Sequence, residues 1–182
     1  MRALGLFKIA VFYLAMTSLA LWAIVARGAL RTVLPEANLR AWLLAGGVGV
    51  AVGFPVVCLT RVMVRHFLWA ERLEQEFRGL VGELTGWEAL AIASLSGLGE
   101  EMLFRGLLQP AVGLWLGAAL FALLHVGPNQ RFVPWTVMAC AVGVLLGALC
   151  LLTGNLLAAI VMHVTINFMN LRYLATRPEG SR

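Results

Sequence analysis

The sequence predicts an all-α integral membrane protein with about six transmembrane helices and an amphipathic interfacial helix between the second and the third. The first observation is composition, because 61% of the 182 residues are hydrophobic and only 13% are charged. The mean hydropathy of +0.88 is well above that of soluble domains. The second observation is that the apolar residues gather into runs long enough to cross a bilayer. The chain is therefore expected to reside in a membrane.

Six hydrophobic segments can be drawn along the chain, at about 5–26, 41–63, 88–110, 113–126, 134–153 and 155–174. The first has Arg2 before it and Lys8 near its start, as in a signal peptide. Its apolar stretch is longer than that of a signal peptide, however, and no clean cleavage site precedes Arg27, so we expect a retained anchor. The fourth is short and stops at Gly127 and Pro128, which suggests that it ends in a water-filled vestibule.

The segment between the second and third spans is rich in charge, yet it also contains regularly spaced apolar residues. They recur every three or four positions, at Trp69, Leu73, Phe77, Leu80 and Leu84. This spacing places them on one face of a helix and predicts an amphipathic helix at the membrane interface. The alternative is a solvated loop in which the periodicity is incidental.

These segments divide the chain into two N-terminal transmembrane helices at 1–64, the interfacial helix at 65–87, a four-helix core at 88–174 and a polar tail at 175–182. Lys and Arg residues indicate the orientation, because cytoplasmic loops are enriched in them. A cytoplasmic N-terminus places ten of these residues on the inner side and only three, Arg27, Arg31 and Arg40, on the outer side. Both termini are thus expected in the cytoplasm.

The basic residues lie mostly beside the apolar runs, so topology explains the net charge of +5 and no nucleic-acid partner is expected. A composition rich in Ala, Gly, Leu and Arg is typical of a bacterial chain, which predicts the bacterial inner (cytoplasmic) membrane. All nine acidic residues are Glu, and the chain has no Asp. Mechanisms that need an aspartate dyad or an Asp-oriented histidine triad are therefore excluded.

Three charged residues, Glu100, Glu101 and Arg105, lie within the third predicted span. Charges at this depth are costly unless they pair or face a cavity. Glu101 and Arg105 are four residues apart with the acid first, the favourable order for a helical ion pair, so Glu101 is expected to neutralise Arg105 and support the site. Glu100 points about 100° away and is left to act elsewhere. The alternative is that the pair is purely structural.

Further polar residues lie in other predicted spans, with His125 ending the fourth and His163 and Asn167 on the sixth. A helix rises about 1.5 Å per residue, and the hydrocarbon core is about 30 Å thick. Counting along the expected direction of each span places Glu100, His125, His163 and Asn167 about 12 to 18 Å from the inner face. Three helices are therefore expected to build one polar site at a common depth.

Hydrolysis is the chemistry that these four residues fit. A carboxylate and an imidazole can deprotonate and orient a water molecule, and a second imidazole with an amide can stabilise an oxyanion. The alternative is a Zn²⁺ ion held by Glu100, His125 and His163, with bound water as the nucleophile. No compact HExxH spacing supports that alternative, so we favour a site with no metal and no cofactor.

Two other classes of function remain open at this stage. A rhomboid-like serine protease would use Ser96 with a histidine, but this leaves the glutamates unexplained. A small transporter or proton relay would also use intramembrane Glu and His, although no inverted repeat is visible. A scaffold or immunity protein that keeps the site without turnover is a further alternative.

Three short motifs resemble those of a known family of intramembrane proteases. The run from Glu100 to Arg105 is similar to the EExxxR motif of the CPBP family (CAAX proteases and bacteriocin-processing enzymes, also called the Abi family). Residues 121–125 resemble its FxxxH motif and residues 163–167 its HxxxN motif. The motifs follow in the family's order, each in a hydrophobic segment, and the resemblance covers about residues 88–174.

The resemblance implies that residues 88–174 form the catalytic core of a glutamic-type intramembrane endopeptidase, a class formerly considered metalloproteases. It implies that Glu100 and His125 activate water and that His163 and Asn167 support the oxyanion. Glu101 and Arg105 match the rest of the first motif. The expected partners are the lipid bilayer and a membrane-associated protein or peptide substrate. Peptide maturation, bacteriocin-type processing or removal of C-terminal sorting signals from surface proteins are all compatible, and a membrane-embedded or membrane-adjacent segment is favoured.

Overall fold

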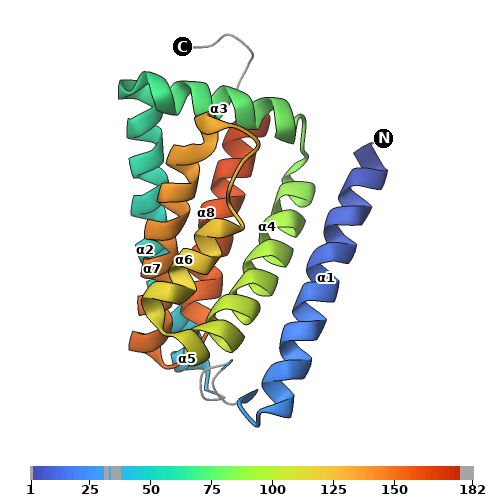
Figure 1. The fold of residues 1–182 in the computed structure, drawn as a ribbon, viewed down its shortest axis with the longest axis vertical. Coiled ribbons are helices and arrows are strands. Elements are labelled where there is room, and N and C mark those ends of the chain that lie inside the picture. The colour runs from blue at the N-terminus through green and yellow to red at the C-terminus, as the bar shows by residue number, and fades with distance from the viewer. Residues whose placement is uncertain (1, 31–32, 34–37, 177–182) are drawn as a thin grey trace.

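A computed structural model describes residues 2–30, 33 and 38–176, and within them every regular element is a helix (Figure 1). Residues 177–182 of the predicted tail lie outside the described part of the chain. Arg31, which was predicted to lie on the outer side of the membrane, also lies outside it. The elements in order are α1 (Arg2–Ala26), α2 (Leu39–His66), α3 (Leu68–Val81), α4 (Gly86–Glu101), the π-helix η2 (Met102–Leu108), α5 (Gln109–Val112), α6 (Leu114–Leu123), the 3₁₀ turn η3 (Gln130–Phe132), α7 (Val133–Thr153) and α8 (Leu157–Thr176).

Four helices in the described residues are long and apolar enough to cross a membrane, and they run over Gly5–Ala26, Leu39–His66, Gln130–Thr153 and Leu157–Thr176. The third predicted span is helical throughout α4, η2 and α5, but it is more charged than these four helices, because it contains Glu88, Glu100, Glu101 and Arg105. The fourth corresponds to the shorter apolar helix Leu114–Leu123. An all-helical integral membrane protein is thus confirmed, whereas the number of six spans stays a prediction.

The amphipathic helix predicted at 65–87 is present as α3, and it lies across one end of the bundle in Figure 1. It is shorter than predicted, because Gly82 adopts a positive φ of 62° and ends the helix, which leaves Leu84 outside it. Ala70 and Leu73 are buried against the bundle, while Leu80 is 68% exposed and does not join this face. The helix therefore caps the bundle with fewer residues than the periodicity suggested.

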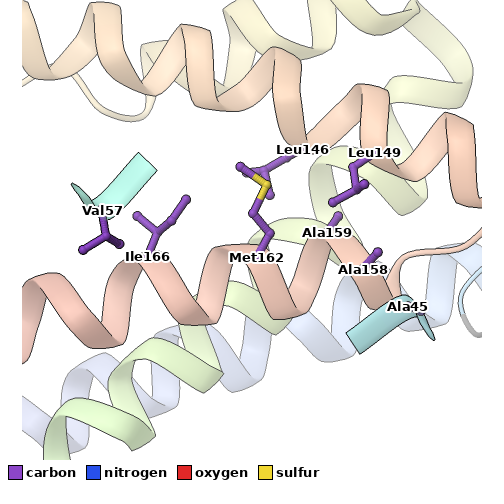
Figure 2. Packing of buried hydrophobic residues seen from close by; sticks show 8 residues of the cluster. All are labelled: Ala45, Val57, Leu146, Leu149, Ala158, Ala159, Met162 and Ile166. Atoms are coloured by element: carbon purple, nitrogen blue, oxygen red, sulfur yellow. The ribbon is translucent and has the colours of Figure 1, made fainter. Parts of the chain in front are cut away.

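The main core lies between α2, α7 and α8. Figure 2 shows its buried side chains, which are Ala45, Val57, Leu146, Leu149, Ala158, Ala159, Met162 and Ile166. Helices α2 and α8 approach closely because α2 presents glycine to its partner: a Cβ on Gly49 would lie 2.5 Å from the carbonyl oxygen of Ala158. Small residues of this kind are how helices pack within membranes. The core thereby holds α8, and with it His163 and Asn167, in a defined position.

Helix α4 starts at a capping box. The Thr85 hydroxyl accepts a hydrogen bond from the Glu88 backbone N–H, and the Glu88 carboxylate accepts one from the Thr85 backbone N–H. The helical stretch that follows runs without a break through η2 and α5 to Val112. The π-helical turns of η2 were not expected from the sequence. Such turns often occur at functional sites, and this one carries Arg105.

Candidate active site

The structure brings Glu100, His125 and His163 together from three separate segments. Glu100 lies in the last turn of α4, His125 in the turn after α6 and His163 in the middle of α8. One carboxylate oxygen of Glu100, Oε2, lies 3.8 Å from His125 Nε2 and 3.8 Å from His163 Nε2. The common depth expected from residue spacing therefore corresponds to a real cluster of side chains.

Each imidazole is oriented by a hydrogen bond from its other ring nitrogen. Nδ1–H of His125 donates to the carbonyl oxygen of Phe121 at 2.8 Å, since a carbonyl can only accept. Nδ1–H of His163 likewise donates to Glu101 Oε1 at 2.7 Å. In the neutral ring the remaining nitrogen, Nε2, then carries a lone pair. Both lone pairs belong to the Nε2 atoms that lie 3.8 Å from Glu100 Oε2.

Glu101 and Arg105 form the expected ion pair, with Nη1 of Arg105 donating to Glu101 Oε1 at 2.9 Å. Glu101 is 0% exposed and Arg105 3%, so both charges are withdrawn from solvent and depend on their partners. The guanidinium also donates to the carbonyl oxygen of Gly143 on α7 at 2.9 Å and lies over the Phe121 ring, 4.4 Å from its centroid. Together with the hydrogen bond from His163 to Glu101, the pair thus ties α4 and η2 to α7 and α8.

Asn167 is placed near the cluster but is engaged elsewhere. Its Nδ2 donates to the Ser96 hydroxyl at 3.0 Å, and that hydroxyl donates to the carbonyl oxygen of Ala93 at 3.2 Å. Ser96 therefore holds the Asn167 amide in place. Among the hydrogen bonds of the described residues, none joins the Ser96 hydroxyl to an imidazole. The serine-protease alternative lacks its serine–histidine contact here.

A cavity of about 370 Å³ connects these residues to the underside of α3. Glu100, His125, Ser96 and Asn167 form its polar end. Its apolar wall comes from α2, α3, α4, α7 and α8 and includes Trp69, Leu73, Phe77, Trp135, Met138 and Leu174, while Arg61 and Glu74 also border the cavity. Mostly apolar walls with a few convergent polar groups are the usual form of a substrate site. The volume suits a short stretch of peptide.

Sequence reasoning missed Tyr13 on α1, whose hydroxyl donates to Glu100 Oε1 at 3.0 Å and which also lines the cavity. The depth argument places it in the same layer as the other site residues, although it does not predict the contact. Tyr13 lies eight residues after the start of the first span at Gly5, which in the orientation predicted from the sequence is about 12 Å from the inner face and within the same layer.

The three residues considered for zinc have suitable donor atoms, but these atoms lie farther apart than ligands on a bound Zn²⁺ ion. Ligand atoms about 2.0–2.1 Å from a tetrahedral Zn²⁺ lie about 3.3–3.4 Å from one another. Both Nε2 atoms are 3.8 Å from Glu100 Oε2, and no group of three His, Cys, Asp or Glu in the described residues is placed to hold a metal. The arrangement fits hydrogen bonding through an intervening molecule better.

Comparison with known proteins matches residues 82–169 to the family model described as type II CAAX prenyl endopeptidase Rce1-like. The match is just under half of the chain and runs from the turn before α4 into α8, so it contains all six predicted site residues and leaves out α1, α2 and α3. Over 68 residues the chain is 40% identical to the uncharacterized protein YpbD of Bacillus subtilis (strain 168). This stretch is 37% of the chain and 35% of that protein. No solved structure matches.

Proposed function

We propose that this protein is an intramembrane endopeptidase that cleaves membrane-embedded or membrane-adjacent peptide segments with water activated by Glu100 and His125. The match of residues 82–169 to the Rce1-like family model supports this class of activity. One observation carries the proposal. Glu100 Oε2 is buried, accepts no hydrogen bond from the described residues, and lies 3.8 Å from the Nε2 atoms of both histidines.

The first step follows from the hydrogen-bonding capacity of these three atoms. Glu100 Oε2 and Nε2 of the neutral His125 ring are acceptors, so a water molecule between them donates its protons to these two atoms and turns its oxygen lone pair to the substrate. That oxygen bonds to the carbonyl carbon of the scissile peptide while a proton passes to the catalytic pair. The same proton is then delivered to the amide nitrogen, the C–N bond breaks, and a carboxylic acid and an amine leave, after which the acid passes its remaining proton to the amine or to water.

The oxyanion of the intermediate is stabilised by Asn167 and His163. An amide nitrogen has two N–H groups, and only one of those of Asn167 is used by Ser96, so the second is left for the oxyanion. His163 supplies a second donor when its ring carries both protons, because Nδ1–H stays on Glu101 and Nε2–H then faces the site. Glu101 and Arg105 hold this ring in place.

The cavity supports a peptide as the substrate. Its aromatic and aliphatic wall favours apolar side chains, and such a segment can arrive by diffusion within the membrane. We place the protein in a bacterial inner membrane with six spans and both termini in the cytoplasm, so that α3 lies at the cytoplasmic interface. Maturation of bacteriocin-type peptides or processing of C-terminal sorting signals of surface proteins fits this location.

The direct test uses purified protein in liposomes with internally quenched peptides: a CAAX-type sequence with a prenyl chain, the same sequence without it, and an unmodified apolar segment. We expect cleavage of the unmodified apolar peptide, and the rate should survive exhaustive chelation, because the three candidate ligands are not spaced for zinc. Activity that is lost on chelation and restored by Zn²⁺ alone would establish the metal-dependent alternative.

The same liposomes distinguish a protease from a transporter. A proton flux that requires Glu100, with no cleavage of any of the three peptides, would favour a proton pathway. Labelling by a fluorophosphonate probe would favour Ser96 as a nucleophile. Absence of cleavage, flux and labelling would favour a scaffold or immunity protein and would remove the proposed activity.

A further inference from the structure

Helix α1 lies outside the residues that match the family, yet it contributes a side chain to the proposed site. The Tyr13 hydroxyl donates to Glu100 Oε1 at 3.0 Å, and the tyrosine lines the same cavity as Glu100 and His125. In Figure 1, α1 runs beside α4, and contacts between α1 and both α4 and η2 are extensive. The hydrogen bond joins residues 87 positions apart in the sequence.

The position of Tyr13 is set by close packing next to Glu100 itself. Gly99 faces α1, and a Cβ there would lie 2.9 Å from Thr17 Oγ1 and 3.3 Å from the Tyr13 carbonyl oxygen. Seven residues later, a Cβ on Gly106 would lie 2.7 Å from Ile24 Cδ1. Two glycines about two turns apart allow the helices to meet along their length, as small residues do in membrane helix pairs. The register of α1 against α4 is therefore defined at the site.

The hydrogen bond has a consequence for the orientation of the Glu100 carboxylate. The terminal torsion of a glutamate side chain is broad, so packing alone fixes it poorly. Tyr13 engages Oε1, which leaves Oε2 as the oxygen that faces His125 and His163. A donor on one oxygen thus selects the rotamer in which the other is directed at the two imidazoles.

We infer that Tyr13 is a positioning residue that orients the Glu100 carboxylate, and that α1 thereby completes the proposed active site. The inference rests on the proposed function, because it assigns Tyr13 a task in that reaction. The alternative is that Tyr13 only helps α1 to pack, in which case its hydroxyl has no bearing on the rate.

The test replaces Tyr13 with phenylalanine and measures cleavage of the unmodified apolar peptide in liposomes. We expect kcat to fall by about 10- to 100-fold, the range for loss of a hydrogen bond to a charged group, with KM and thermal midpoint nearly unchanged. The matched control is Thr17→Val, which removes a hydroxyl from the same face of α1 that donates only to its own helix, at the Tyr13 carbonyl. That variant should retain the wild-type kcat.

Combination with Glu100→Gln separates positioning from packing. If Tyr13 acts through Glu100, adding Tyr13→Phe to Glu100→Gln should lower the residual rate no further. An equal loss in both backgrounds, an unchanged kcat for Tyr13→Phe, or an equal loss in Thr17→Val would each overturn the inference. A failure of the proposed function would give a different result, because the Glu100→Gln variant would then cleave the peptide as fast as the wild-type protein.

A second measurement does not depend on turnover and keeps the tyrosine ring in place. With 3-fluorotyrosine incorporated at position 13, the ¹⁹F resonance should shift on Glu100→Gln, which changes the acceptor, and stay constant on Glu83→Gln, an exposed substitution in the loop after α3. An unchanged ¹⁹F chemical shift in the Glu100→Gln variant would contradict the hydrogen bond between Tyr13 and Glu100.

Discussion

Replacement of Glu100 by glutamine is expected to lower kcat for peptide cleavage by about 10²- to 10⁴-fold, the usual contribution of a general base. Glutamine has nearly the same shape and can still accept from Tyr13, but its amide cannot take a proton from water. Because the binding cavity is otherwise unchanged, KM should change much less than kcat. The measurement is the cleavage rate of the apolar peptide in liposomes over a range of peptide concentrations.

The matched control for this substitution is Glu83→Gln, the same chemical change at an exposed position between α3 and α4. It should leave both kinetic constants at their wild-type values. Wild-type kcat in Glu100→Gln, with Glu83→Gln equally active, would show that the carboxylate takes no part in the reaction.

Replacement of Glu101 by alanine is expected to reduce both stability and activity. Arg105 would be left buried without its carboxylate, and removing one partner of a buried ion pair costs about 3–5 kcal/mol. His163 would also lose the acceptor that orients its ring. The measurements are the yield of folded protein and its thermal midpoint in detergent, together with kcat.

A double variant separates these two consequences. Glu101→Leu with Arg105→Met replaces the pair by apolar side chains, which in buried pairs is often neutral or stabilising. We expect the thermal midpoint to recover while kcat stays low, because His163 still lacks its partner. An inactive Glu101→Ala variant with wild-type stability would contradict the structural part of this assignment.

Much of this site could be predicted from residue spacing, because the rise of a helix and the thickness of a bilayer are nearly constant. Those two quantities placed Glu100, His125 and His163 in one layer, and the structure brings them together. The spacing of Glu101 and Arg105 likewise predicted their ion pair. The three motifs that resemble those of a CAAX protease family all lie inside residues 82–169, so the match of these residues to the Rce1-like family model agrees with that resemblance.

Contacts that depend on the rotation and register of separate helices could not be predicted in this way. The hydrogen bond between Asn167 and Ser96 requires α4 and α8 to face each other at those positions, which no local pattern encodes. Tyr13 was not predicted to join the site, because a single uncharged tyrosine in an apolar span has only a small free-energy cost and does not by itself indicate a function. The end of α3 was misplaced because the periodicity continues past Gly82, whereas the backbone turns there.

The proposed activity is tested most directly by mass spectrometry of membrane peptides from cells that produce either the wild-type protein or Glu100→Gln at equal levels. We expect pairs of fragments that meet at a new carboxyl and amino terminus, within or beside an apolar segment, only with the wild-type protein. Identical fragments from both membranes would contradict a proteolytic role for this site.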